Sequence, residues 1–299
     1  MSIVFTDIAV PSFEGSTVVV PAPGPGAGNW AGAASAVLVD GTFWMTYRVR
    51  RPLREGRGVA VVVARSQDGE RFETVAEINR ESVGAESFER PVLIPRPAGG
   101  WRLYLSCATP GSKHWWIEAV DADLPHLLPR GRRHMVLTGD GTLAVKDPVI
   151  IHDGEGWHMW VCCHPLSEPG QEDRMSTWYA SSVDGIAWSM RGEVLRGRRG
   201  AWDARGARVT AVIGTDPLTV LYDGRPTAEH NWFETTGIAT EVDGVLVATG
   251  DSPIAMSPHS DHALRYVAAV PLPDGRVRFY FEAARPDGAH DLRTSVTTI

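Results

Sequence analysis

The chain is patterned mainly in short runs in which apolar and polar residues alternate. Runs of this kind cover residues 36–49, 100–107 and 277–284. Alternation with a period of two places apolar side chains on one face of an extended segment, and it is typical of β-strands. Few segments carry apolar residues at helical spacing. The pattern therefore predicts an all-β fold.

Tight turns are predicted between several of these strands. Residues 64–78 and 180–195 both contain an Asp-Gly pair followed by an aromatic residue. Asp-Gly favours the positive φ angles of a two-residue hairpin. With 31 glycines and 21 prolines, the composition suits many short strands joined by turns.

The sequence also contains a long internal repeat. Residues 88–107 align with residues 145–163, which places Arg90-Pro91 on Asp147-Pro148, 57 positions later. Similar steps along the chain reach Ala33, Arg208 and Arg265. This periodicity defines five units. Each unit has the pattern strand, turn, strand, long loop, strand, short turn, strand.

Five such units predict a five-bladed β-propeller with four-stranded antiparallel blades, formed as one domain by residues 1–299. The predicted blades are residues 30–80, 88–138, 145–197, 206–250 and 262–299. The last unit ends after three strands, and we expect residues 2–10 to supply the fourth. Closing a ring in this way leaves few exposed sheet edges. The alternative is a set of β-sandwiches with coincidental spacing.

Charge and composition narrow the class of protein. A formal net charge of −7 disfavours a nucleic-acid partner, which normally needs a basic surface. The first residues lack a basic region ahead of an apolar segment, and no run approaches 18 apolar residues. We therefore expect no membrane association and a cytoplasmic location.

The cysteines predict neither disulfides nor a metal site. There are three, and Cys162 and Cys163 are adjacent, so a disulfide framework is not expected. His164 follows them directly, but consecutive strand residues point to opposite faces and would not converge on one ion. We predict no metal and no cofactor.

Candidate chemistry gathers in loops that a propeller would place on one rim. Loops before the first strand of each unit and loops after the second strand share that rim, and both are rich in Asp, Glu, Arg, His and Trp. The opposite rim carries plain Asp-Gly turns. We therefore expect a functional site on the first rim, on the propeller axis.

The repeat count, the Lys-Asp-Pro-Val segment at 146–149, the Asp-Gly-aromatic hairpins and the scarcity of helix together resemble one family. The sequence is similar to the five-bladed β-propeller glycosidase superfamily, which includes glycoside hydrolase families 43, 32, 68, 117 and 130. The resemblance implies an axial pocket where carboxylates of different blades cleave or transfer a glycosyl unit. One carboxyl group must hold a proton while another stays ionised, so their pKa values must differ.

Carried over to this chain, the resemblance makes Asp147, Glu89 and Glu234 the candidate catalytic residues, with Glu234 as the acid. Purely structural roles are the alternative: Asp147 and Glu89 could bond backbone N–H groups, and Glu234 could form a loop salt bridge. The family pattern also expects an Asp in the first blade, whereas residues 29–33 contain no acid. Three alternatives are open: another blade supplies that function, the chain catalyses a different reaction, or it only binds.

Basic residues occur at the same register as Asp147. Arg208 and Arg265 take this position in the next two units, and Arg48 is expected close by, as are Lys113 and Arg205. Arginine binds carboxylates and phosphates in a bidentate fork. The substrate could therefore be an acidic or phosphorylated sugar, or phosphate could be a co-substrate. Alternatively, the arginines only neutralise the carboxylates.

Further substrate-binding candidates are His114 and His164 after second strands, Asp203, and Trp30 as a stacking surface. The alternating Trp101, Trp157 and Trp160 are expected in the core instead. We therefore predict a glycoside hydrolase-like enzyme with a small soluble carbohydrate substrate. The alternatives are a glycoside phosphorylase, a lyase, isomerase or cyclase, or a non-catalytic carbohydrate-binding propeller.

Overall fold

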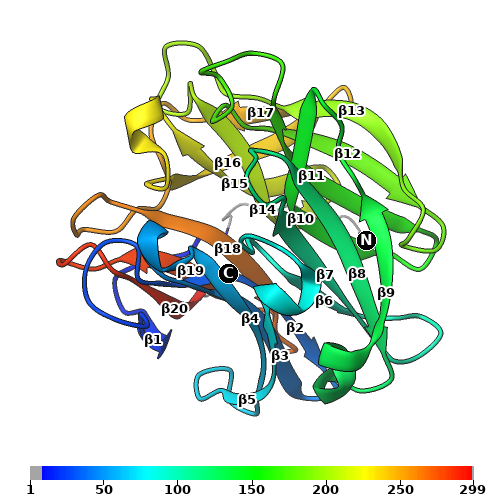
Figure 1. The fold of residues 1–299 in the computed structure, drawn as a ribbon. Coiled ribbons are helices and arrows are strands. Elements are labelled where there is room, and N and C mark those ends of the chain that lie inside the picture. The colour runs from blue at the N-terminus through cyan, green and yellow to red at the C-terminus, as the bar shows by residue number, and fades with distance from the viewer. Residues whose placement is uncertain (1–8, 298–299) are drawn as a thin grey trace.

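A computed structural model describes residues 9–297, and this part of the chain is built almost entirely from β-strands (Figure 1). Three sheets have four antiparallel strands each. The first contains β6 (Val92–Pro95), β7 (Trp101–Ala108), β8 (Trp115–Ala122) and β9 (Arg132–Leu137). The second contains β10 (Leu143–His152), β11 (Trp157–Pro165), β12 (Ser176–Ser182) and β13 (Ser189–Leu195). The third contains β14 (Gly206–Thr215), β15 (Leu218–Arg225), β16 (Thr235–Val242) and β17 (Val245–Thr249).

The remaining eight strands form a sheet with two four-stranded parts. One part contains β2 (Trp30–Val39), β3 (Thr42–Arg50), β4 (Gly58–Ser66) and β5 (Glu73–Asn79). The other contains β18 (Leu264–Pro271), β19 (Val277–Ala284), β20 (His290–Thr297) and β1 (Thr17–Val20). A single parallel bridge between Trp30 and His290 joins the two parts. The predicted all-β class and four-stranded antiparallel sheets are therefore confirmed.

Four short 3-10 helices lie in the loops of the described residues. They are η1 (Leu53–Glu55), η2 (Arg80–Val83), η3 (Pro125–Arg130) and η4 (Ala228–His230). No helix within residues 9–297 has the length and apolar character needed to cross a bilayer.

The sheets follow one another around the molecule in chain order, with β18 to β20 beside β2 (Figure 1). The first strands make a continuous series of contacts: β2 with β6, β6 with β10, β10 with β14, β14 with β18, and β18 with β2. Each first strand thus lies toward the centre, and the later strands lie farther out.

Apolar side chains fill the space between neighbouring sheets. Val61 of β4 and Leu103 of β7 share one buried cluster, and Tyr104 of β7 and Met159 of β11 share the next. Corresponding clusters lie between the other neighbouring sheets. Alternating strand residues face opposite sides, so each sheet can supply two of these clusters.

The two predicted Asp-Gly turns are longer than two-residue hairpins, because β4 ends at Ser66 and β5 begins at Glu73, and β12 ends at Ser182 and β13 begins at Ser189. Only the glycines of the two pairs have positive φ, 75° at Gly69 and 71° at Gly185. Both turns use the same hydrogen bonds. Asp68 Oδ1 accepts the N–H groups of the second and third residues after it, at 2.8 Å each. Asp184 Oδ1 does the same at 2.8 and 2.9 Å. These aspartates are therefore turn-forming residues, as the sequence predicted for that rim.

The strand that completes the last sheet differs from the predicted one. β1, which pairs antiparallel with β20, begins at Thr17. Of the predicted residues 2–10, residues 9–10 are not in a strand, and residues 2–8 lie outside the described part of the chain. Val19 and Val20 of β1 pack on an apolar cluster.

Three first strands contain a β-bulge at a corresponding place, at residues 32–35, 146–149 and 265–268. The bulged residues with positive φ are Ala33 (52°), Asp147 (52°) and Tyr266 (53°). Positive φ is uncommon for residues with side chains, and a bulge of this kind redirects a side chain out of the regular alternation. The bulges therefore set which side chains face the central space.

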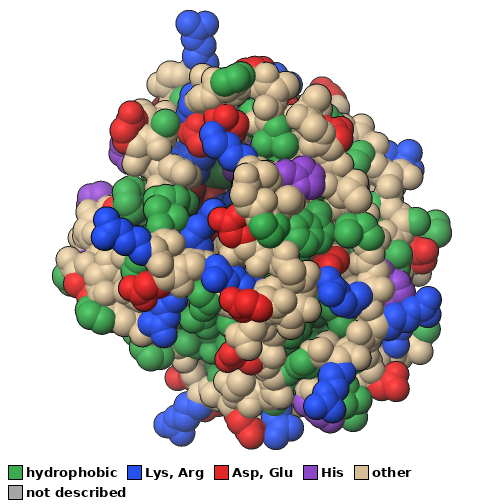
Figure 2. All heavy atoms as spheres, in the orientation of Figure 1, with side chains coloured by type: hydrophobic (Ala, Val, Ile, Leu, Met, Phe, Trp, Pro, Cys, Tyr) green, Lys and Arg blue, Asp and Glu red, His purple; other side chains and the backbone are tan. Residues whose placement is uncertain are grey.

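Basic and acidic side chains are interspersed over the face shown in Figure 2. Neither charge forms a broad patch of a single sign there.

Candidate functional site

A polar pocket of about 460 Å³ lies at the amino-terminal ends of the first strands. Its basic lining residues are Arg48, Arg57, Lys113, Lys146, Arg208, Arg225 and Arg265. Its acidic lining residues are Glu89, Glu172, Asp173 and Glu234. Tyr266, His164, Trp115 and Trp232 also border it. Basic side chains therefore outnumber acidic ones on the pocket wall.

The strand register explains why these residues converge. Lys146, Arg208 and Arg265 each occupy the last or nearly last paired position before a bulge, opposite a residue of the second strand. Glu89 lies just before β6, where its N–H donates to Ser106 O at 3.0 Å. The repeat spacing predicted Arg265 as the counterpart of Asp147 in the last sheet. The structural counterpart is Tyr266, because Asp147 and Tyr266 each lie in the bulge of their own strand.

Tyr266 connects charged groups at the base of the pocket. Its hydroxyl accepts a hydrogen bond from Arg208 Nη1 at 2.8 Å, and it lies 3.2 Å from Glu89 Oε2 and 3.3 Å from Asp147 Oδ2. The Arg208 guanidinium also lies over the tyrosine ring, 3.8 Å from its centroid. Burial raises the pKa of Tyr266 well above its usual value. This phenol therefore keeps its proton.

Glu89 is held by basic residues on two sides. It forms an ion pair with Arg48, and Arg57 Nη2 lies 3.8 Å from its Oε1. Burial opposes ionisation of Glu89, but Arg48 and Lys146 outweigh it and hold its pKa below the usual range. Glu89 is therefore an ionised carboxylate on the pocket wall.

Asp147 lies beneath the pocket wall and is fully buried. It accepts hydrogen bonds from the Arg90 N–H at 3.0 Å and from Arg208 Nη1 at 2.9 Å. Burial again opposes ionisation, and Lys146 and Arg208 hold the pKa of Asp147 below its usual range. Asp147 thus shows the backbone bonding considered as its structural role, and it also fixes Arg208.

Glu234 lies between arginines of two sheets. It pairs with Arg225 and with Arg265, whose Nη1 is 2.5 Å from Oε2. Despite burial, these two arginines hold the pKa of Glu234 well below its usual value. An ionised Glu234 does not fit the role of proton donor that the sequence suggested.

A carboxylate from another strand occupies the space above Gly32, at the first-unit position where the family pattern expects an acid. A Cβ on Gly32 would lie 2.2 Å from Glu282 Oε2. Glu282, on β19, bonds Arg48 Nη2 at 3.0 Å and Arg265 Nη2 at 2.7 Å. Burial disfavours its charge, but Arg265 and Arg48 keep the pKa of Glu282 below its usual range.

Asp223 differs from the other carboxyl groups of the cluster. It receives hydrogen bonds from Arg208 Nη2 at 2.6 Å and from the Tyr266 N–H at 3.1 Å. Burial nevertheless raises its pKa to about 6, against the opposing charge of Arg208. Asp223 is fully buried and lies behind the pocket wall.

His164 borders the pocket as a neutral imidazole. Its Nδ1 lies 3.0 Å from the Glu172 carbonyl oxygen, and its Nε2 lies 3.5 Å from Cys162 Sγ. Burial and the charges of Lys146 and Arg225 lower its pKa to about 3. Both ring nitrogens of His164 thus have protein partners, and the side chain adds no charge to the pocket wall.

Three predicted substrate-binding residues lie outside the pocket lining. Trp30 is buried and stacks on His290, with ring centroids 4.4 Å apart. His114 Nδ1 is 2.7 Å from the Thr109 hydroxyl. Asp203 is buried and bonded to Arg198 and to the Tyr222 hydroxyl at 2.8 Å. The predicted residues that do line the pocket are Arg48, Glu89, Lys113, His164, Arg208, Glu234 and Arg265, whereas Asp147 and Arg205 are not part of the lining.

Several pocket residues were missed by the sequence analysis, above all Tyr266, Lys146 and Arg225. Tyr266 and Lys146 directly adjoin predicted residues, so their closeness in sequence was an available signal. Arg225 ends β15 and carried no comparable signal.

No group of three or more His, Cys, Asp or Glu side chains among residues 9–297 is arranged to hold a metal ion. All three cysteines are free and buried.

Solved structures of other proteins share this fold. No protein-family model and no curated protein sequence matches the chain. The β-1,2-mannobiose phosphorylase of Listeria innocua is 14% identical, with a TM-score of 0.66 over 97% of this chain and 93% of that one. The α-L-arabinofuranosidase of Lactobacillus brevis is 12% identical, with a TM-score of 0.68 over 90% of each chain.

A glycoside hydrolase family 43 enzyme of Xanthomonas citri, solved with xylotriose, is also 12% identical, with a TM-score of 0.68 over 95% of this chain and 90% of that one. The chain thus has the fold of glycoside hydrolases and phosphorylases. This confirms, at the level of the fold, the resemblance to propeller glycosidases that the sequence indicated.

Proposed function

We propose that this chain is a five-bladed β-propeller enzyme of the glycosidase type, which cleaves a small anionic glycoside or transfers its glycosyl unit to phosphate. The excess of basic over acidic side chains on the wall of the axial pocket carries this proposal. The contacts that run from β2 through β6, β10, β14 and β18 back to β2 support the five-bladed arrangement. The fold shared with hydrolases and phosphorylases supports the reaction type, by analogy.

The pocket supplies ionised carboxylates and one protonated phenol. Glu89 and Glu234 can accept a proton or stabilise positive charge on the sugar ring. Tyr266 keeps its proton and is our candidate donor to the leaving oxygen. The phenolate formed by that transfer would lie 2.8 Å from Arg208 Nη1, which would stabilise its charge.

Two cations are held loosely enough to bind a substrate anion. Lys146 Nζ is 3.4 Å from Asp147 and Arg57 Nη2 is 3.8 Å from Glu89, whereas Arg208 and Arg265 have carboxylate contacts under 3 Å. Both loosely held cations lie over the Trp115 ring. We propose that they bind the carboxylate or phosphate group.

Phosphorolysis is the second candidate because it requires one proton donor and a bound anion, and no carboxylate dedicated to activating water. Each of the pocket carboxylates Glu89 and Glu234 is already paired with arginine. The two reactions differ in whether turnover needs phosphate and whether the product is a sugar phosphate.

The test is turnover of neutral, uronic-acid and phosphorylated aryl glycosides, each with and without about 10 mM phosphate, a concentration above ordinary KM values. Glu89→Gln and Glu234→Gln should each lower kcat/KM by at least about 100-fold. Glu55→Gln, an exposed glutamate on η1, is the matched control and should match the wild type. Full rates in both pocket variants, or no turnover of any glycoside by the wild type, would overturn the proposal.

A further inference from the structure

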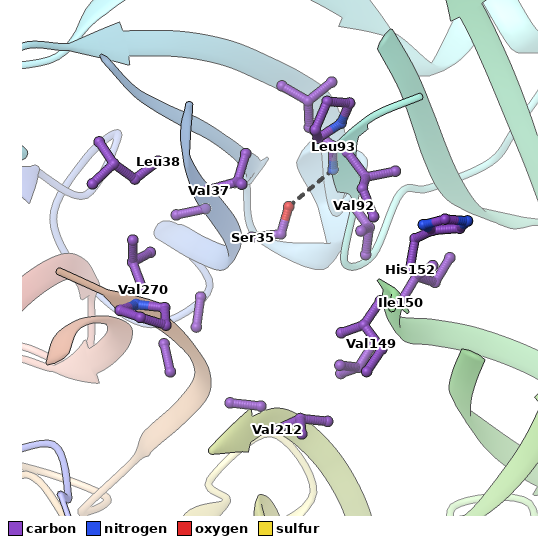
Figure 3. A pocket seen from close by; sticks show the side chains of 18 of the residues that line it. Ser35, Val37, Leu38, Val92, Leu93, Val149, Ile150, His152, Val212 and Val270 are labelled. Carbon is purple, nitrogen blue, oxygen red and sulfur yellow. Dashed lines mark hydrogen bonds between the residues drawn. The ribbon is translucent and has the colours of Figure 1, made fainter. Parts of the chain in front are cut away.

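A second cavity, of about 680 Å³, lies at the other end of the first strands. It is bordered by residues in the later part of each strand: residues 35–38 on β2, 149–152 on β10 and 268–271 on β18. Figure 3 shows side chains of β2, β6, β10, β14 and β18 around one open space. This cavity and the polar pocket therefore lie toward opposite ends of the same ring of strands.

The lining of this cavity is apolar. Its wall includes Val37, Val92, Ile150, Val212 and Val270 (Figure 3). Among the described residues that line it, none is Asp or Glu. Water can form few hydrogen bonds with such a wall. Apolar surface of this extent therefore favours an apolar ligand.

Polar side chains in the cavity wall are mostly engaged with the protein. The Ser35 hydroxyl lies 2.9 Å from Thr46 Oγ1 and accepts the Leu93 N–H at 3.1 Å. Arg96, also on the wall, pairs with Asp121 at 3.1 Å. These groups leave little polar character for a sugar.

Arg90 is the exception. Its side chain borders the cavity and is 3% exposed, and it crosses the centre to donate to Thr210 O at 2.7 Å and Val267 O at 3.2 Å. Its Nε has no hydrogen-bond partner within the described residues. A guanidinium has five N–H donors, so two bonds to neutral carbonyls leave other N–H groups unbonded, and within the described residues its positive charge forms no ion pair.

The carboxylates nearest to Arg90 do not pair with its guanidinium. From Arg90, Asp147 accepts a hydrogen bond only from the backbone N–H. The other carboxylate oxygen of Asp147 pairs with Arg208. Asp223 also pairs with Arg208, at 2.6 Å. A buried cation beside an apolar cavity is unfavourable unless an anion approaches it.

We propose that this cavity is a second binding site, which takes a molecule with an apolar body and a single anionic group, such as a medium-chain or aromatic carboxylate, with the anion toward Arg90. The site is separate from the polar pocket and does not depend on the proposed glycoside chemistry. The apolar wall selects the body of the ligand, and the guanidinium selects the charge.

Isothermal titration calorimetry with octanoate, 1-naphthoate and uncharged octanol tests this site in the full chain. Octanoate and naphthoate should bind with a negative heat-capacity change, because apolar surface is buried. Octanoate should bind at least tenfold more tightly than octanol. No binding of either carboxylate, or equal affinity for octanol and octanoate, would overturn the proposal.

Two tryptophan substitutions locate the binding. Ala269→Trp fills the cavity and should weaken octanoate binding at least tenfold, whereas Ala187→Trp, at an exposed turn, should leave it within twofold. Unchanged octanoate binding by folded Ala269→Trp would contradict the assignment. Glycoside turnover by the same variant should persist, which separates this test from that of the proposed function.

Arg90→Gln tests the role of the charge. It should remove the preference for octanoate over octanol while octanol still binds. If this variant does not fold, the comparison of octanoate with octanol in the wild-type chain decides the same point. Persistent preference in a folded Arg90→Gln would show that Arg90 does not select the anion.

Discussion

Individual residues of the polar pocket are coupled through Tyr266, whose hydroxyl meets Arg208, Glu89 and Asp147. Ion pairs in such a buried place cost much of their attraction in lost hydration. A purely structural core would be more simply built from apolar side chains. The density of buried charge here therefore favours a functional role, and Tyr266 is where that role is best tested.

Tyr266→Phe should lower kcat/KM for the best glycoside by at least about 100-fold, because it removes the candidate proton donor. The ring stays in place, so the fold should survive. Tyr179→Phe removes a comparable hydroxyl, which bonds His158 outside the pocket, and should leave turnover unchanged. Steady-state kinetics measure both, and equal rates for Tyr266→Phe and the wild type would exclude the phenol as donor.

Asp223 should give stability an unusual pH dependence. Its pKa is about 6 in the fold, above the value near 4 of an unfolded chain. The folded state then binds more protons between these values, so the contribution of Asp223 is full below about pH 4 and is lost as the pH rises through 6. Glu89, Asp147, Glu234 and Glu282 have lowered pKa values and act in the opposite direction, losing stability as pH falls.

Thermal unfolding of the wild type and Asp223→Asn from pH 4 to pH 8 isolates this contribution. Carboxylates that do not interact with Asp223 contribute equally to both proteins and cancel in the difference. The wild type should gain stability relative to the variant as the pH falls from 6 to 4. A constant difference across this range would contradict the raised pKa.

Among the strands, β2 and β19 fit together because Gly32 has no side chain. Gly32→Ala would force Glu282 away from Arg48 and Arg265, since the new Cβ would lie 2.2 Å from its carboxylate. Removing one partner from a buried ion pair costs about 3–5 kcal/mol. We expect a loss of this size in the free energy of unfolding.

Gly141→Ala is the control for this substitution, because no heavy atom outside the chain neighbours of Gly141 lies within 4 Å of the added Cβ. Urea denaturation of both variants gives the comparison. A Gly32→Ala protein as stable as Gly141→Ala would mean that Glu282 moves aside at little cost.

The strands also show how far sequence reasoning reaches. Alternation and Asp-Gly turns predicted the four-stranded sheets, because both depend on local backbone preferences. The spacing of the repeat placed Glu89 and Arg208 near one another, because corresponding positions of successive units lie at the same rim. It assigned Arg265 instead of Tyr266 as the counterpart of Asp147. Both strands carry the bulge at the corresponding place, so the error of one residue comes from the spacing assumed for the intervening segments.

Side-chain direction was harder to predict than position. Trp30 lies beside the pocket residues in sequence register, yet its indole is buried against His290. By contrast, Trp101, Trp157 and Trp160 are buried as their alternation predicted. Alternation determines the face of a regular strand but not the outcome at a strand end, where packing partners come from distant parts of the chain.

At the scale of the whole molecule, the two ends of the first strands differ in chemistry. The amino-terminal ends carry the charged pocket and the other ends carry the apolar cavity. Arg90 borders the apolar cavity, and its backbone N–H donates to Asp147. The change of chemistry follows strand direction in β10, β14 and β18, where Lys146, Arg208 and Arg265 come before the bulge and apolar residues come after it.

The pairing of β1 with β20 joins the two ends of the described chain, and it should control both stability and association. Arg293 donates to the Ser16 hydroxyl and carbonyl at 2.8 Å, and Val20 packs on an apolar cluster. Val20→Asp would place a charge against that cluster and release β1, at a cost of roughly 2 kcal/mol. The freed edge of β20 would then be open to pairing with another chain.

Val18→Asp makes the same change on the exposed face of β1, where Val18 is 43% exposed, and should behave as the wild type. Differential scanning calorimetry and size-exclusion chromatography with light scattering measure the two effects. Val20→Asp should show a lower Tm together with concentration-dependent association. A lower Tm without association would mean that the β20 edge stays protected by other contacts, and an unchanged Tm would show that β1 contributes little to closing the sheet.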